Sequence, residues 1–550
     1  MTFRWIILFT LITSISWAQS LSTSNLPILS IDTRGKTIVN EPKIPTKISL
    51  FDRGPGALNQ ISGSPTLKIW AGVEFRGSTS QEDFYFLPGL IKKPYGIEIW
   101  TDSTGRTSTD TSLVQMPAES DWVLNASYND RTFMRDVLAH YVGIRMGLLG
   151  SRTRYVELVI NDVYQGVYIL MEKIKKGKYR VPISDLHPTE NTGDNLTGGY
   201  LMKIDKTTGS PSKNWISNYG SGLSSKKSLI QVEYPKYDSL SNSQYTYIKN
   251  YMDTFEKSLH DDSPSNPKST YKSMINLPSF VNFFLLNEAV RNVDGYLLST
   301  YFYKDKDSKG GKLTMGPIWD FNIAFGNAEY ADGWKPQGWS FTARETSAGA
   351  ADAFQVPFWW GKLLTDSSFV NLASKRWKDM RKSFLTADRI HAYIDSTQNV
   401  LKEPLARNFV KFPLFGKKLW PNYYVAPSLT EDVIWLKNWI TQRLLWLDAQ
   451  LNQFNVLVLG SELEIPTSIL FPNPTQAMMT VQCTVLDDGP VDVELFDLLG
   501  SIVYAKQFPG QSYPLFQQTL DLQSYSAGTY RIRVRQQARI LFQGTCIKQN

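Results

Sequence analysis

One stretch of the sequence, residues 287–327, constrains the fold more than any other, because it has the pattern of a β-hairpin with an acidic residue at each end. An apolar run typical of a helix leads to Asp294, and a strand-like run follows it. A polar turn that contains Gly310-Gly311 leads into a second strand-like run, which ends at Asp320. Because a hairpin folds its ends back on each other, the sequence predicts that the carboxylates of Asp294 and Asp320 lie close together.

Two neighbouring carboxylates at the ends of a hairpin are the arrangement that kinase-like enzymes need. One Asp orients and deprotonates the acceptor hydroxyl, and a second Asp holds the magnesium ion of ATP. We expect Asp294 to take the first role as a weak base, and Asp320 to take the second. The same pair also allows a carbohydrate-active enzyme that uses the two carboxylates as acid and base, an alternative that the 16 Trp residues permit.

The composition limits the partners of the chain. Hydrophobic residues make up 42% of the 550 residues, and the formal net charge is only +7. No dense stripe of Lys and Arg accompanies this charge, so we expect no nucleic-acid partner. The tract from Glu172 to Lys178 is locally basic, and it is either a solvated turn or a loop that faces phosphate groups.

The first residues have the pattern of a secretory signal peptide over residues 1–18. Arg4 precedes an apolar run too short to span a bilayer, and cleavage is expected after Ala18. No later run reaches transmembrane length, so we expect a soluble mature protein outside the cytoplasm. Export permits a disulfide between the two cysteines, Cys483 and Cys546, and two buried free thiols are the alternative.

The hydrophobic pattern divides the rest of the chain into three parts. Alternating strands dominate residues 25–235, and helical periodicity dominates residues 236–455. Helices are expected at 243–259, 278–291, 366–383, 387–401 and 430–452. Short alternating strands with frequent turns over residues 465–550 predict a small all-β sandwich. The predicted fold class is therefore α+β, with the carboxylate hairpin in the helical part.

Several short sequence blocks follow one another between residues 66 and 450. They are FRGSTS (75–80), KKPYGIEI (92–99), DRTFMR (130–135), NDVYQGVYILMEK (161–173), TGGYLMKID (197–205), the carboxylate hairpin, and Trp439, Arg443 and Asp448. In this order the blocks resemble the CotH kinase family. The resemblance implies an atypical protein-kinase-like domain over residues 25–455, with a β-rich N-lobe and a helical C-lobe. It also implies ATP and Mg²⁺ as cofactors, Asp294 as the catalytic residue and Asp320 as a metal ligand.

The resemblance places further residues on the phosphate side of the site. Arg76 has a fork of donors for phosphate oxygens, or else it closes a strand turn by pairing with a carboxylate. Lys93 and Lys203 compete for the role of the kinase lysine, and Lys203 is slightly favoured because it ends a strand that follows two glycines. Glu172 is expected to pair with that lysine or to hold a second metal. A surface ion pair is the alternative for each of these residues.

The chain departs from the kinase pattern at one metal ligand. Kinases keep an Asn five residues after the catalytic Asp, whereas Ser299 occupies that position here. Asn322, two residues after Asp320, is expected to supply the missing oxygen. No H-R-D sequence is present. A catalytically inactive surface, adhesin or structural protein on a pseudokinase scaffold is therefore the main alternative, because ATP is scarce outside cells.

The end of the chain has its own motifs. Phe471-Pro472-Asn473-Pro474 opens the last part, and Ala527-Gly528-Thr529-Tyr530 lies near its end. These motifs resemble a type IX secretion C-terminal sorting domain, and a generic β-sandwich binding module is the alternative. The resemblance implies export by the type IX machinery to the surface or surroundings of a Gram-negative bacterium. The expected function is thus a secreted or surface phosphotransferase that uses ATP–Mg²⁺ on Ser or Thr of a protein substrate.

Overall fold

The computed structural model describes most of the chain after the expected signal peptide. The described residues are 21–207, 209, 211–221, 224–263, 266–346, 354–457, 469–471, 473–484, 489–498, 500–509, 515–536 and 539–549. The predicted signal at residues 1–18 lies outside them. Among the helices of these residues, none combines the length and the apolar character that a membrane crossing requires.

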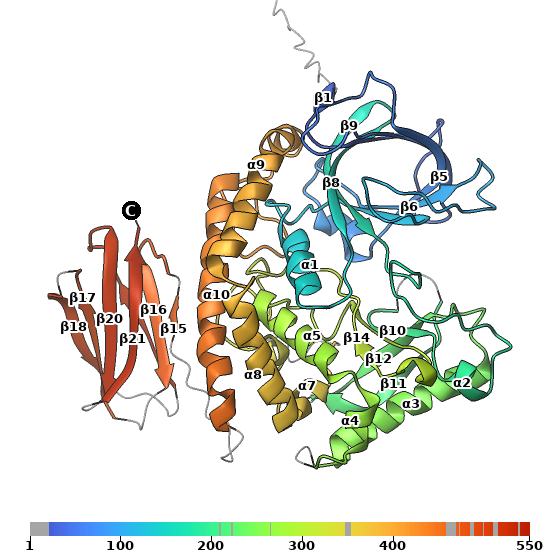
Figure 1. Cartoon of the computed structure of the whole chain (residues 1–550). Coiled ribbons are helices and arrows are strands. Elements are labelled where there is room, and N and C mark those ends of the chain that lie inside the picture. Colours follow the sequence, from blue (N-terminus) through green and yellow to red (C-terminus); the bar gives the residue numbers. More distant parts are fainter. Residues whose placement is uncertain are drawn as a thin grey trace, which may run out of the picture.

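The first part of the chain closes into a β-barrel (Figure 1). In spatial order its strands are β2 (Ile28–Asp32), β3 (Ile44–Phe51), β5 (Leu67–Phe75), β6 (Tyr95–Trp100), β7 (Asp121–Asn125), β9 (Val163–Glu172) and β8 (Thr153–Ile160). The parallel pairing of β2 with β8 closes the barrel. Inward residues such as Ile31, Ile97 and Leu158 form a core of their own. A short ribbon of β1 (Thr23–Ser24) and β4 (Asn59–Gln60) accompanies the barrel.

A five-stranded sheet contains the predicted hairpin. Its order is β11 (Asn214–Ser221), β12 (Ser224–Tyr234), β10 (Tyr200–Ile204), β13 (Thr300–Lys304) and β14 (Thr314–Met315). The hairpin is confirmed, because Phe302 pairs with Met315 in the antiparallel β13–β14 ladder. Met202 and Ile230 share a core with the helices and not with the barrel. Strand β12 ends at Tyr234, and the helix that follows it begins at Asn242.

Helices surround this sheet and connect it to the barrel (Figure 1). They are α1 (Arg135–Arg145), α2 (Gly193–Leu196), α3 (Asn242–Asp261), α4 (Thr270–Met274), α5 (Leu277–Val290), α6 (Ser340–Thr346), α7 (Trp359–Leu363), α8 (Ser367–Lys382), α9 (Ala387–Lys411) and α10 (Leu429–Leu457). Short 3₁₀ turns are η1 (Thr79–Gln81), η2 (Asp83–Tyr85) and η3 (Asp307–Lys309). All five predicted helices are present, and α9 extends ten residues beyond its predicted end.

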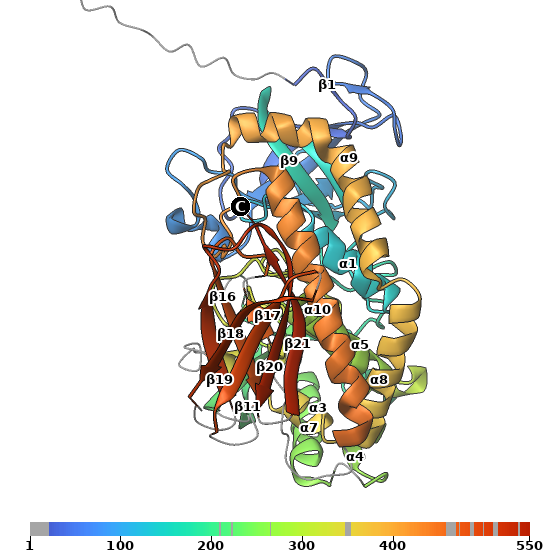
Figure 2. The same cartoon turned by 90° about the vertical axis from the view of Figure 1, so that its left-hand side faces the viewer.

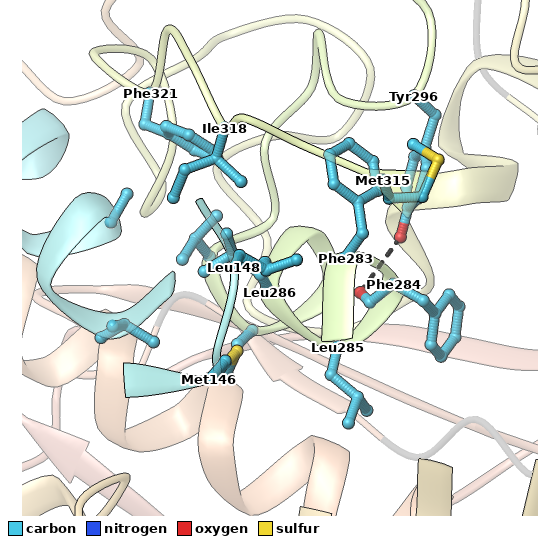
Figure 3. Packing of buried hydrophobic residues seen from close by; sticks show 14 of the residues in the cluster. Met146, Leu148, Phe283, Phe284, Leu285, Leu286, Tyr296, Met315, Ile318 and Phe321 are labelled. Atoms are coloured by element: carbon cyan, nitrogen blue, oxygen red, sulfur yellow. Dashed lines mark hydrogen bonds between the residues drawn. The ribbon is translucent and has the colours of Figure 1, made fainter. Parts of the chain in front are cut away.

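Helix α5 lies in the largest core and fixes both ends of the hairpin (Figure 3). The helix is buried around most of its circumference, so the segments that pack against it present apolar side chains to it. Tyr296, Ile318 and Phe321 join this core, and the hydroxyl of Tyr296 donates to the carbonyl oxygen of Phe284 at 3.2 Å. Tyr296 follows Asp294 by two residues, and Phe321 directly follows Asp320. The same packing therefore positions both acidic residues.

The last part of the chain is the predicted β-sandwich, which stands beside α10 (Figures 1 and 2). One sheet contains β15 (Ile469–Phe471), β16 (Met478–Thr484) and β19 (Leu515–Asp521), and the other contains β18 (Ile502–Phe508), β17 (Val491–Phe496), β20 (Gly528–Gln536) and β21 (Arg539–Lys548). Gln442 on α10 donates a hydrogen bond to the carbonyl oxygen of Asn473. Cys483 and Cys546 are free thiols in the sandwich core, where burial raises the pKa of Cys483 to about 12 and that of Cys546 to about 11.

Candidate active site

A cavity of about 1540 Å³ lies between the barrel and the sheet-and-helix part. Barrel residues line one side of it, and residues from the β10–β14 sheet and the loops after α5 and β14 line the other. Five of the predicted site residues belong to its wall: Arg76, Lys203, Asp294, Asp320 and Asn322. The structure therefore gathers most of the predicted site, including both hairpin carboxylates, around one cavity.

The backbone of Asp320 is held in an unusual conformation from two sides. Its φ of +68° lies in the left-handed region, which costs energy for a residue with a side chain. Its carbonyl oxygen accepts a hydrogen bond from the side chain of Asn292 at 3.3 Å, and the next N–H, of Phe321, donates to Asp136 at 2.8 Å. The loop that carries Asp294 and helix α1 thus both hold the turn of Asp320.

The side chain of Asp320 is in an environment that disfavours its charge. The side chain is exposed toward the cavity, and the protein around it removes part of the bulk solvent that would stabilise the carboxylate. Burial is the largest cause, and the charges of Asp136, Asp294 and Asp205 add to it, so that the pKa of Asp320 rises to about 7. Arg76 acts in the opposite direction. A cation bound beside Asp320 would relieve this repulsion.

Asp294 follows the end of α5 and is fixed by a hydrogen bond. The hydroxyl of Tyr330 donates to Oδ1 of Asp294 at 3.0 Å. The loop behind it is held by an ion pair between Glu288 and Arg443 at 3.0 Å, in which both side chains are fully buried. Glu288 also accepts a hydrogen bond from the hydroxyl of Tyr296 at 3.0 Å. These contacts hold Asp294 at the cavity wall in a defined orientation.

The cavity wall also carries cations and an unsatisfied donor. Atom Nη1 of Arg76 is buried and has no hydrogen-bond partner among the residues that the structure describes, and the guanidinium lies 5.3 Å from the ring of Trp319. Burial lowers the pKa of Arg76. Lys203 lies 3.4 Å from Glu233, and Lys206 donates to the hydroxyl of Thr79 at 3.3 Å. A buried donor without a partner is costly, so this wall is suited to an anionic ligand that supplies the missing acceptor.

Two predicted site residues, Lys93 and Glu172, do not line the cavity. The ammonium of Lys93 stacks over the ring of Phe75 at 4.9 Å. The carboxylate of Glu172 is buried and bonded to Arg152 at 2.7 Å and to Arg180. Glu172 therefore pairs with arginines and not with Lys203. The physical reason is topology, because Glu172 is on barrel strand β9 and Lys203 is on β10 of the other sheet.

Two carboxylates that the sequence interpretation missed belong to the same site. Asp205 lines the cavity two residues after Lys203, at the end of β10, and burial raises its pKa. Asp205 directly follows a strand that two glycines precede, and this pattern could have marked Asp205 as a candidate site residue. Asp136, on α1, is buried against the turn of Asp320, and its pKa rises to about 6, chiefly through burial. No local pattern distinguished Asp136 from an ordinary acidic residue in the first turn of a helix.

The donor set fits an open magnesium site and not a closed metal cage. Among the described residues, no three His, Cys, Asp or Glu side chains converge to enclose an ion. Mg²⁺ usually retains several waters and takes one or two carboxylates together with phosphate oxygens. Asp320 is suited to this role, and Asn322 lines the cavity nearby while its amide donates to Asn129 at 2.9 Å. The unpartnered donor of Arg76 fits a phosphate oxygen of the same ligand.

Comparison with known families gives two matches. The model of the CotH kinase protein family matches residues 73–447, and the chain belongs to this family. The model of the secretion system C-terminal sorting domain matches residues 469–548. The sorting domain indicates that the protein is handled by type IX secretion and is secreted or located at the outer-membrane surface. A comparison with curated proteins gave no match.

Proposed function

We propose that the protein is an exported phosphotransferase that transfers the γ-phosphoryl group of ATP to a Ser or Thr hydroxyl of a protein substrate. The observation that carries this proposal is the cavity that Asp294, Asp320 and Arg76 share, where Nη1 of Arg76 finds no hydrogen-bond partner within the described part of the chain. In this proposal the barrel and the sheet-and-helix part act as the two lobes of an atypical kinase-like domain, and the nucleotide binds between them.

Each wall of the cavity has a role in the proposed reaction. The acceptor hydroxyl oxygen attacks the γ-phosphorus, the bond to the β–γ bridging oxygen breaks, and ADP leaves. Asp294 orients the hydroxyl and receives its proton. Arg76 and Lys203 bind phosphate oxygens, and Asp320, with Asn322 or Asp205, holds Mg²⁺. Bound Mg²⁺ neutralises phosphate charge and aligns the triphosphate.

Transfer of radiolabelled γ-phosphate to a mixture of surface and secreted proteins tests the proposal. Wild type should label acceptors in the presence of Mg²⁺, and Asp294→Asn and Asp320→Asn should lose at least about 100-fold of the rate, as loss of general-base or metal positioning implies. The control is Asp238→Asn, at an exposed position away from the cavity. Equal labelling by wild type and Asp320→Asn contradicts the proposed role of Asp320.

A pseudokinase that serves as an adhesin is the second candidate. The position where kinases keep an Asn is Ser299, which lines the cavity with a φ of +48°. A hydroxyl is a weaker ligand for a second metal ion than an amide oxygen. Absence of any labelling, together with a melting temperature that ATP–Mg²⁺ does not change, supports this candidate over the phosphotransferase.

A further inference from the structure

We infer that a chain of buried asparagines orients Asn322, so that the side-chain oxygen of this proposed metal ligand faces the cavity. The positioning residues in the chain are Asn129, Asn327 and Asn422, and Arg131 fixes its direction. They come from three segments that are distant in the sequence: the residues before α1, the loop after β14 and the loop before α10. This inference rests on the proposed function and names the residues that orient one ligand of its metal ion.

Arg131 sets the direction of the chain, because a guanidinium donates hydrogen bonds but cannot accept them. Its Nη1 donates to Oδ1 of Asn422 at 2.8 Å, and its Nε donates to the carbonyl oxygen of Leu414 at 3.0 Å. The side-chain oxygen of Asn422 therefore faces Arg131, and Nδ2 lies on the other side of the amide group. There Nδ2 of Asn422 donates to Oδ1 of Asn327 at 2.9 Å. The orientation of Asn422 thus determines the orientation of Asn327.

Asn327 holds two segments of the main chain together. Because its Oδ1 accepts from Asn422, its Nδ2 is turned to the opposite side. There Nδ2 donates to the carbonyl oxygen of Asn129 at 3.0 Å and to that of Asn322 at 2.8 Å. The carbonyl oxygen of Asn129 also accepts from Nδ2 of Asn422 at 2.7 Å. Asn129 and Asn322, which are 193 positions apart in the sequence, are therefore held side by side before any ligand binds.

The last link of the chain fixes the side chain of Asn322. Its Nδ2 donates to Oδ1 of Asn129 at 2.9 Å, and both residues belong to the cavity wall. An amide group carries nitrogen and oxygen on opposite sides, so the bond through Nδ2 leaves Oδ1 to the cavity, where Mg²⁺ requires oxygen ligands. Asn322 also forms a side-chain hydrogen bond with Tyr85. Because an amide oxygen has two lone pairs, an acceptor position remains for a cation whichever of these two residues donates.

The chain is buried, so its members are ordered before a ligand binds. Asn129, Asn327 and Asn422 are 1%, 5% and 0% exposed, and Arg131 is 2% exposed. A buried polar network costs free energy unless its hydrogen bonds are made, and a network in which they are made holds its members in one arrangement. Apolar side chains would fill the same space without that cost, so packing alone does not account for a polar chain that ends at the cavity wall.

Binding of Mn²⁺ in place of Mg²⁺ tests the inference without any transfer reaction. The electron paramagnetic resonance signal of free Mn²⁺ gives its Kd in the presence of a non-hydrolysable ATP analogue. Asn129→Ala removes the acceptor of the last link but retains the carbonyl oxygen that Asn327 and Asn422 hold. Asn129→Asp retains an acceptor oxygen in the side chain. The control is Asn408→Ala, which removes a buried amide outside the cavity wall, where Oδ1 accepts from the N–H of Val167 at 3.1 Å.

We expect Asn129→Ala to raise the Kd of Mn²⁺ by about tenfold, as replacement of a residue that orients a metal ligand typically does. Asn129→Asp should retain the wild-type Kd or lower it, because the acceptor remains and a carboxylate adds attraction for the ion. Asn408→Ala should retain the wild-type Kd even if its Tm falls. The double variant of Asn129→Ala and Asn322→Ala should bind no more weakly than Asn322→Ala alone, because Asn129 acts through Asn322.

Unchanged Mn²⁺ affinity in Asn129→Ala overturns the inference, and labelling of acceptors by wild type then leaves the proposed function intact. Equal losses in Asn129→Ala and Asn129→Asp also overturn it, because the bond then runs from Asn129 to the oxygen of Asn322. Losses that add in the double variant have the same meaning, since Asn129 then acts independently of Asn322.

Two further outcomes separate the inference from its foundation. If wild type binds no Mn²⁺ together with the ATP analogue, the proposed function and the inference both fail. If the variants differ in Mn²⁺ affinity as expected but no acceptor is labelled, the chain of asparagines stands as a metal-positioning network on an inactive scaffold.

Discussion

Replacing Asp320 by Asn should stabilise the ligand-free protein, although it removes the proposed metal ligand. The surroundings raise the pKa of Asp320 from 3.8 to about 7, so the folded state binds a proton that the unfolded state releases. Stability from this proton is present below about pH 4 and is lost as the pH rises through 7. Asn is neutral at every pH and is well tolerated at the φ of +68°, so Asp320→Asn avoids this loss.

The size of the effect follows from the same pKa. Without solvent screening, the pKa shift would lower the free energy of unfolding by roughly 4 kcal/mol at pH values above 7. Because cavity water reaches the carboxylate and screens it, we expect about 1–2 kcal/mol, or a rise in Tm of about 2–4 °C. The gain should increase from pH 5 to pH 8 in differential scanning fluorimetry without metal or nucleotide. Asp238→Asn, at an exposed position, should change Tm by less than about 1 °C throughout.

A lower Tm for Asp320→Asn than for wild type at pH 8 refutes this reasoning, because it means that the folded protein stabilises the ionised carboxylate. A gain that is equal at pH 5 and pH 8 also refutes it, since the effect is then not electrostatic. Addition of ATP–Mg²⁺ at pH 8 should reverse the order of the two proteins. Wild type should gain stability from the ligand, and the variant should gain less.

Three other changes probe the support of the site. Arg443→Met leaves Glu288 buried without its ion-pair partner and should lower the free energy of unfolding by about 3–5 kcal/mol, measured as a lower urea midpoint. The control Leu445→Ala, at an exposed position on the same helix, should have little effect. Arg76→Met should raise the Kd for ATP–Mg²⁺ by about tenfold or more in isothermal titration without lowering Tm, because none of the described residues accepts a hydrogen bond from Nη1 of Arg76. A loss of Tm without loss of affinity contradicts this. Gly77→Ala should lower Tm or weaken nucleotide binding, since Gly77 has a φ of +93° and an added Cβ would lie 2.1 Å from the hydroxyl oxygen of Ser80. Wild-type values in both assays contradict the expectation that the turn at Gly77 has no room for a side chain.

The hairpin shows what local patterns can predict. The glycine turn and the two strand-like runs are encoded within some 30 residues, so the joint placement of Asp294 and Asp320 follows from sequence alone. The helices and the terminal sandwich are similar cases, because their periodicity is local. The free cysteines were left open, since spacing alone does not determine whether Cys483 and Cys546 pair.

The rest of the site depends on contacts between distant segments. Closure of the barrel requires β2 to pair with β8, and the hydrophobic periodicity of each strand does not indicate its partner when the two strands are far apart in the sequence. Glu172 was misassigned for this reason, because its barrel strand brings it to Arg180 and not to Lys203. Asp136 was missed because its importance arises only when α1 packs against the turn of Asp320. Tertiary packing, and not residue type, distinguishes such residues.

The most direct test of the central claim is a crystal structure of the protein with Mn²⁺ and a non-hydrolysable ATP analogue, with the ion located by anomalous scattering. The account predicts one Mn²⁺ peak at about 2.1 Å from a carboxylate oxygen of Asp320, with the γ-phosphate between Arg76 and Asp294. Nucleotide bound outside the cavity between the barrel and the helices, or an ion with no bond to Asp320, contradicts it.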